Sequence, residues 1–112
     1  MDLFEKDVAA SWPQAVHPQL HVGTSGWAYP DWVGPFYPTG TAPRDFLATY
    51  SRRFGAVEIG STFYRTPTAK TVEAWNAATP EDFRFAPKVP QVITHEKRLE
   101  GCADELDAFL DV

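Results

Sequence analysis

The sequence predicts an α/β protein built around a parallel sheet, and three observations lead to this fold class. Short runs rich in β-branched and aromatic residues alternate with stretches whose apolar residues recur at helical spacing. Regular alternation of strands and helices implies parallel strands joined by right-handed crossovers. The 112 residues are 44% apolar and 22% charged, with eight Phe and four Trp that can fill a core. This composition is ordinary for one globular domain or part of one.

The same totals exclude several classes of protein. A net charge of -5 disfavours a general polyanion binder. Cys102 is the only cysteine, which excludes an internal disulfide framework and indicates a reducing compartment. No apolar run is long enough for a membrane span, and the first residues lack the basic and then apolar order of a signal peptide. We therefore expect a cytoplasmic protein with no membrane partner.

The first part of the chain is predicted to lead into the domain. Residues 1–19 form this lead-in, in which residues 7–15 are expected to make a short helical turn, and the domain covers residues 20–112. A strand is predicted over 21–24. The loop that follows, 25–41, carries five aromatic residues between glycines and prolines. A loop of this length and composition is expected to pack down on the fold.

The next predicted elements are a helix over 43–54 and a strand over 56–60. Pro43 suits the first turn of a helix, and Gly55 is expected to end it in the left-handed conformation. In the strand, Glu58 is the one charged residue among residues that favour the interior. Burying a carboxylate is costly unless it is paired or hydrogen-bonded, so Glu58 is a candidate for a functional role.

A second helix and a third strand follow. Thr66 and Pro67 predict a helix cap with proline in the first turn, and the apolar stripe of this helix ends before Pro80. The segment 83–89 alternates as a strand, and the ladder is expected to be interrupted near Pro87.

The last part of the chain is predicted to supply the final helix in the alternation of strands and helices. Residues 91–100 are interpreted as a polar connection, and Leu106, Phe109 and Leu110 begin another amphipathic helix. The order is therefore strand, helix, strand, helix, strand, helix, with no internal repeat.

Several motifs occur in order from about residue 21 to the end of the chain. They are Gly23–Trp32 (GTSGWAYPDW), Phe36–Pro38 (FYP), Val57–Tyr64 (VEIGSTFY), Trp75, Thr79–Pro80, Phe83–Ala86 (FRFA), Lys88 and Ile93–His95 (ITH). Together they closely resemble the YecE-like family (domain of unknown function 72). The resemblance implies a barrel of the (β/α)₈ type, and it carries over no settled biochemical role.

The chain departs from the family pattern in two ways. Gly60 stands where many members are expected to carry a polar Asn or Asp. A full barrel of this type needs ~250 residues and eight strands, whereas this chain supplies about three strand–helix units. We therefore interpret residues 20–112 as the N-terminal part of a YecE-like TIM-barrel domain, apparently truncated. The chain is then either a fragment or a protein that completes itself by association through unpaired sheet edges.

In such a barrel, chemistry is placed at the carboxyl ends of the strands. These positions here are Thr24–Ser25, Gly60–Ser61 and Lys88–Val89. Side-chain alternation places Glu58 and Lys88 inward from neighbouring strands, where they could pair. One interpretation is a structural ion pair. The other is a mouth in which Lys88 binds an anionic group and Glu58 acts as general acid or base. A Schiff base on Lys88 is less favoured.

Further candidate ligand-binding residues follow the same strand ends, namely Ser25, Trp27, Tyr29, Ser61 and Tyr64. The aromatic rings could stack on a sugar or a base, or could simply plug the mouth of the barrel. His95, in the loop after the third strand, is a candidate acid/base residue or a solvated side chain. No metal site is predicted, because the histidines and acidic residues follow no ligand spacing, and no cofactor is indicated.

Three functional interpretations follow from these residues. The first is an enzyme-like barrel that binds or transforms a small polar or phosphorylated ligand at this face, with the reaction type and even enzymatic activity left open. The second is a nucleic-acid-binding barrel, in which aromatic residues are interleaved with Arg65, Lys88, Lys97 and Arg98, although the acidic total disfavours it. The third is an inactive truncated fragment that associates with itself through its sheet edges.

Overall fold

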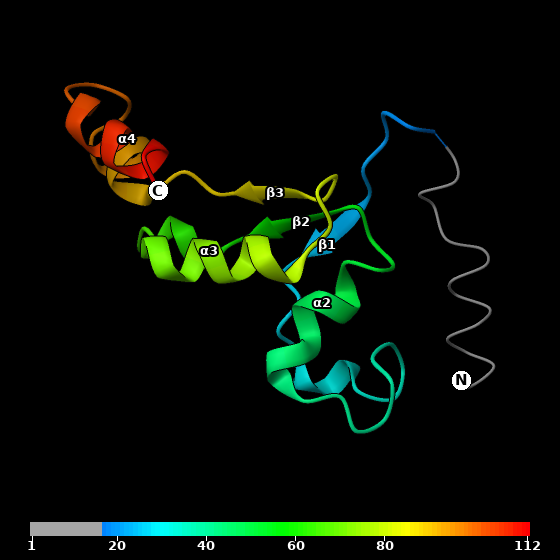
Figure 1. The fold of residues 1–112 in the computed structure, drawn as a ribbon. Helices are drawn as coiled ribbons and strands as arrows, with labels where there is room; N and C mark the ends of the chain where they lie inside the picture. The colour runs from blue at the N-terminus through cyan, green and yellow to red at the C-terminus, as the bar shows by residue number, and fades with distance from the viewer. Residues whose placement is uncertain (1–16) are drawn as a thin grey trace.

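The computed structural model describes residues 17–112, and its centre is a three-stranded parallel sheet in the order β1-β2-β3 (Figure 1). The strands are β1 (Gly23–Ser25), β2 (Ala56–Ile59) and β3 (Arg84–Pro87). The parallel pairing confirms the predicted α/β class, although the strand ends differ from the predicted ones by one or two residues. The helical turn predicted over 7–15 lies outside the described residues.

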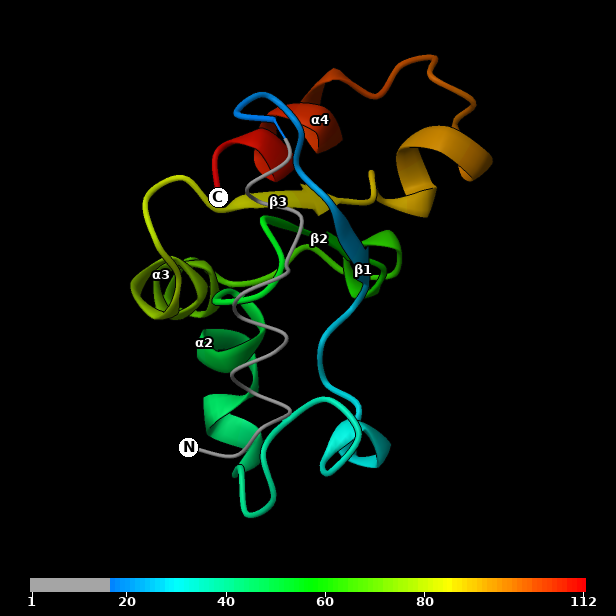
Figure 2. The same cartoon turned by 90° about the vertical axis from the view of Figure 1, so that its right-hand side faces the viewer.

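Two helices cover one face of the sheet. α2 (Phe46–Tyr50) and α3 (Ala69–Ala78) lie on the same side of the strands in both views (Figures 1 and 2). α4 (Ala103–Leu110), the red helix, lies beyond the carboxyl end of β3. The arrangement leaves the carboxyl edge of the sheet next to the loops that carry the predicted site residues.

The core forms where β2 meets the helices. Val57 and Ile59 are 1% and 3% exposed, whereas Glu58 between them is exposed on the other face. This alternation follows from the period of two along a strand, and it confirms the predicted faces of β2. The buried core cluster consists of Tyr37, Phe46, Tyr50, Val57, Ile59 and Phe83.

The first helix differs from its prediction at both ends. The segment predicted over 43–54 begins with a 3-10 turn, η3 (Pro43–Asp45), and continues as α2, which ends earlier than predicted. Gly55 does not adopt the predicted left-handed conformation. Its N–H donates to the carbonyl of Val22, and its carbonyl accepts the N–H of Arg84. The prediction was wrong because this glycine enters the next strand, and strand pairing fixes its backbone.

The second helix begins later than predicted and ends as predicted. Thr68 is its cap and accepts the N–H of Thr71 through its hydroxyl at 3.2 Å, so Thr66 is not the capping residue. Helical backbone begins only at Ala69, so Pro67 lies before the helix and not in its first turn. The helix ends before Pro80, as its apolar stripe predicts.

The segment predicted as a polar connection over 91–100 contains a turn of π-helix, η5 (Val92–Glu96). Ile93 in this turn is 2% exposed. The prediction was wrong because a single buried residue gives no apolar stripe that could reveal the turn. The predicted last helix is confirmed as α4, and an ion pair between Lys97 and Glu105 joins it to the end of η5. Within residues 17–112, no helix is long and apolar enough to cross a membrane.

The loop over 25–41 packs down on the fold, as predicted, and the structure shows that it does so against α2. Tyr37 in this loop is fully buried, and its ring stacks on Phe46 with centroids 4.5 Å apart. Its hydroxyl donates to the carbonyl of Trp27 at 2.5 Å. The ring of Tyr37 therefore packs the loop against α2, and its hydroxyl holds the loop backbone at Trp27.

Arg53, which follows α2, contacts the same loop, and no pattern in the sequence singled out this residue. Its side chain is only 3% exposed, donates to the carbonyl of Phe36 and lies over the ring of that residue, 5.3 Å from the centroid. The 3-10 turn η2 (Pro30–Trp32) brings Trp32 edge-on to the same ring. A buried guanidinium is retained here by a carbonyl and an aromatic face.

The hydroxyls of two buried tyrosines are expected to titrate at an unusually high pH. Burial raises the pKa of Tyr37, helped by the nearby Tyr50, and burial also raises the pKa of Tyr50 against the opposing hydrogen bonds from Thr24. Because these pKa values lie above those of the unfolded chain, the free energy of unfolding should fall as the pH rises above ~10.

The measurement is tyrosinate absorbance during alkaline titration, followed together with circular dichroism. Tyr37 and Tyr50 are expected to ionise only as the fold is lost, whereas all four tyrosines of the urea-unfolded chain ionise together. A single transition at the same pH in folded and unfolded chains would contradict this expectation.

Candidate functional site

Ser25 and Glu58 meet at the carboxyl edge of the sheet. They lie directly opposite each other in the register of β1 and β2. The Ser25 hydroxyl donates to Oε1 of Glu58 at 3.1 Å, and both side chains are exposed. Glu58 is therefore not a buried carboxylate, which corrects the reason for which the sequence singled it out. It is instead an oriented carboxylate on the face of the sheet opposite the buried side chains of β2.

A hollow of about 310 Å³ adjoins this pair. Its lining residues are Ser25, Gly26, Trp27, Ala28, Tyr29, Ile59, Gly60, Ser61 and Trp75. The predicted ligand-binding residues are thus brought together here, with the exception of Tyr64, and Glu58 stands next to the hollow without lining it.

The first loop is shaped so that its aromatic rings border the hollow. Gly26 has φ +82°, a conformation that favours glycine, and the hydroxyl of Tyr29 donates to the carbonyl of Ser25 at 2.6 Å. The ring of Trp27 packs edge-on against Trp75 of α3, with centroids 5.6 Å apart. Sequence reasoning placed Trp75 in the apolar stripe of its helix and among the family motifs, but not at the site, and in the structure its ring joins the loop to α3.

The remaining predicted residues gather around the ring of Phe63. The ammonium of Lys88 lies 5.6 Å from the ring centroid, the His95 ring packs edge-on at 5.0 Å, and Tyr64 packs edge-on at 5.1 Å. Tyr64 is 74% exposed. Phe63 lies within the motif 57–64, but no charge or spacing marked it as the centre of a cluster.

The predicted pairing of Glu58 with Lys88 is not formed in residues 17–112, where the Glu58 carboxylate bonds Ser25 and the Lys88 ammonium lies over Phe63. The alternation of β3 stops at Pro87, so it does not carry through to Lys88. The site residues fall instead into two groups, which share the short 3-10 turn η4 (Ser61–Phe63). Ser61 faces the hollow and Phe63 carries the second group.

Thr62 holds η4 against the strand ends. Its side chain is 1% exposed, and Oγ1 lies 3.0 Å from the carbonyl oxygen of Ile59 and 2.7 Å from that of Lys88. One buried hydroxyl therefore contacts the carboxyl ends of both β2 and β3. Sequence reasoning missed Thr62 because a threonine in a loop gives no signal of burial.

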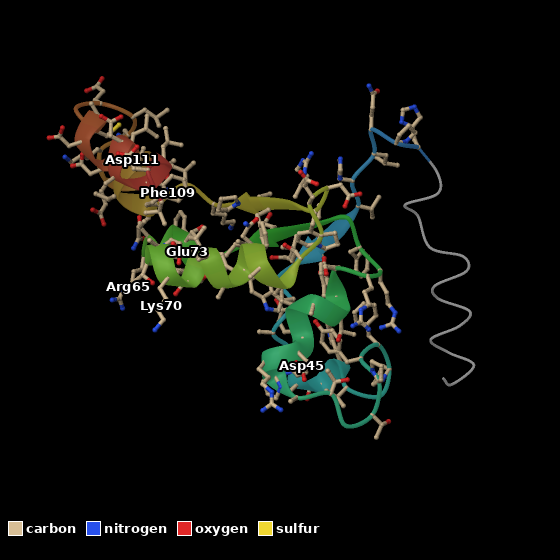
Figure 3. All side chains as sticks on the ribbon, viewed as in Figure 1. Asp45, Arg65, Lys70, Glu73, Phe109 and Asp111 are labelled. Atoms are coloured by element: carbon tan, nitrogen blue, oxygen red, sulfur yellow. The ribbon has the colours of Figure 1, made fainter. Side chains whose placement is uncertain are left out.

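A larger hollow of about 460 Å³ lies between α3 and α4 and contains none of the predicted site residues. Its lining is mainly apolar, and Glu73 and Phe109 come from the two helices that border it (Figure 3). Few polar groups are available there to orient a ligand, so we interpret it as a packing surface. Across residues 17–112, no group of three or more His, Cys, Asp or Glu comes together in a way that could hold a metal ion.

The three parallel strands with helices over one face form an open α/β sheet, which is consistent with part of a (β/α)₈-type barrel. The model of the family described as "Protein of unknown function DUF72" matches residues 21–112, and the chain belongs to this family. The resemblance found in the sequence is thereby confirmed.

Two named relatives are similar to this chain. The UPF0759 protein YecE of Escherichia coli K12 is 33% identical over 91 residues, which cover 81% of this chain and 31% of that protein. The UPF0759 protein YunF of Bacillus subtilis 168 is 34% identical over 92 residues, covering 82% and 32% respectively. The chain thus spans about a third of the length of these curated relatives. No solved structure matches it.

Proposed function

We propose that the carboxyl edge of this sheet binds a small polar ligand, with Glu58 as the residue that receives its hydroxyl or amino groups. The observation that carries the proposal is the exposed Ser25–Glu58 hydrogen bond of 3.1 Å beside a hollow of about 310 Å³. In barrels of this type, ligands are held at this end of the strands.

Each residue of the proposed site has its own role in binding the ligand. Ser25 donates to one carboxylate oxygen of Glu58 and fixes its orientation, while the rest of the carboxylate remains available as an acceptor. The rings of Trp27 and Tyr29 offer apolar faces on which the carbon skeleton of a polyol or sugar can stack, and Ser61 adds a hydroxyl. If the bound group reacts, Glu58 would act as general base or acid.

Ligand-observed NMR on the purified chain tests this proposal, with glycerol, inositol and glucose as probes. Glu58→Gln should weaken binding by at least about tenfold, or ~1.4 kcal/mol, because the charged acceptor is lost. Glu81→Gln is the matched control, since Glu81 is also an exposed glutamate but lies in the turn before β3. Saturable binding that is equal in wild type and Glu58→Gln would overturn the proposal, as would the absence of saturable binding by all three probes.

An oligonucleotide titration separates this proposal from the nucleic-acid interpretation. Phosphate backbone contacts release counterions, so binding of that kind must weaken steeply as salt rises. We expect no salt-dependent binding of a thymidine oligonucleotide by a chain of net charge -5. Tight, salt-dependent binding would instead assign the chain to the nucleic-acid class.

A further inference from the structure

We propose that Lys88 and His95, which both contact the Phe63 ring, form a subsite for the phosphate group of a phosphate monoester. The inference rests on the proposed function, because the subsite would receive the charged end of the ligand whose polar body lies at Ser25 and Glu58. The subsite adds the chemical class of the ligand, which Ser25, Glu58 and the residues lining the hollow do not define.

Lys88 supplies a positive charge that is held in place without being neutralised. Its ammonium lies 5.6 Å from the centroid of Phe63, within the range of a cation–π contact, and its side chain is exposed. In the described part of the chain, the ammonium forms no ion pair with a carboxylate. An aromatic face restricts where the ammonium moves but leaves its three N–H donors available to an anion.

His95 supplies a second donor next to the same ring. Its ring packs edge-on to Phe63, with centroids 5.0 Å apart and planes at 88°. Nδ1 lies 2.7 Å from the hydroxyl oxygen of Thr94. When this hydroxyl donates to Nδ1, the imidazole proton is on Nε2, which can then donate to a ligand. The ammonium and the imidazole come from different segments of the chain, and both lie against the same ring, 5.6 Å and 5.0 Å from its centroid.

This pair of donors suits a phosphate monoester better than a carboxylate or a neutral group. A phosphate dianion presents several oxygens, which can accept from an ammonium and an imidazole at once, and charge-assisted bonds of this kind are the strong ones. The donors follow β3, at the edge of the sheet where ligands are bound in (β/α)₈ barrels. The exposed Glu96 adjacent to His95 disfavours a larger polyanion at this position.

Amide NMR spectra of the isotope-labelled chain, titrated with inorganic phosphate and with glycerol phosphate, test the subsite. We expect shifts centred on Phe63, Lys88 and His95. Lys88→Met should weaken phosphate binding by at least about tenfold and His95→Gln by about threefold or more. The matched controls are Lys70→Met, an exposed lysine that points away from the sheet on α3 (Figure 3), and His21→Gln, an exposed histidine before β1. Both controls should bind phosphate like wild type.

The outcomes distinguish this inference from the proposed function. Phosphate binding that depends on Lys88 and persists in Glu58→Gln supports the subsite, even if none of the neutral probes binds. Unchanged phosphate affinity in a folded Lys88→Met chain overturns it, and so does binding of neutral probes without binding of phosphate. A Lys88-dependent response to an oligonucleotide, with no response to inorganic phosphate, would place a phosphodiester there and overturn the assignment to a monoester.

Discussion

Replacing Gly23 with alanine is expected to prevent β1 from pairing with β2. A Cβ at this position would lie 1.8 Å from the carbonyl oxygen of Ala56 and 2.5 Å from its carbon, both of which belong to the backbone of the neighbouring strand. Backbone cannot turn aside as a flexible side chain can, so the strands must separate. We expect a loss of at least about 3 kcal/mol in the free energy of unfolding, measured by urea denaturation.

Gly60→Ala is the matched control for this substitution. A Cβ at Gly60 would meet no atom within 4 Å, and its φ of -78° suits any residue. The change in the free energy of unfolding should stay within about 1 kcal/mol. Equal urea midpoints for Gly23→Ala and Gly60→Ala would mean that the close approach of β1 to β2 does not exist in the protein.

Truncating Tyr37 to alanine is the second change with a large expected effect. Tyr37 is fully buried, stacks on Phe46 and donates to the carbonyl of Trp27. Its removal leaves a cavity between the loop over 25–41 and α2 and frees the loop that borders the hollow. We expect a loss of about 3–5 kcal/mol in the free energy of unfolding.

Tyr37→Phe separates the ring from the hydroxyl. It keeps the stacking on Phe46 and removes only the bond to Trp27, so the expected loss is about 1–2 kcal/mol. Amide signals of the loop should move in this variant while those of β2 stay in place. If Tyr37→Ala proves no more destabilising than Tyr37→Phe, the ring does not fill the core as described.

The parts of the fold that follow a simple period could be predicted from the sequence. The alternation through Val57, Glu58 and Ile59 predicted the two faces of β2, and the apolar stripe containing Trp75 predicted the half-buried side of α3. Both patterns depend on local geometry that packing reinforces. The clustering of Ser25, Trp27, Tyr29 and Ser61 was also foreseeable, because parallel strands bring their carboxyl ends to one edge.

The start of α3, the end of β3 and the contacts between distant segments could not be predicted, because the local sequence is compatible with more than one outcome. Thr66 and Thr68 are both acceptable helix caps by their local sequence, and in the structure it is Thr68 that accepts the N–H of Thr71. The position of Lys88 was extrapolated from strand alternation, but β3 ends one residue earlier, and the side chain turns to Phe63. Contacts between segments distant in the chain, such as Phe63 with His95, carry no periodic signal at all.

The position of Thr62 could couple ligand binding at Ser61 to ligand binding at Phe63, on the two sides of η4. Its hydroxyl has one proton for two carbonyls, those of Ile59 and Lys88, and it lies between Ser61 and Phe63 in the chain. A ligand that draws the backbone of Lys88 outward must break this contact or carry η4 with it. If the proposed ligand binds in this way, occupancy on one side of η4 would alter the affinity on the other, and thermodynamic linkage would make that influence equal in both directions.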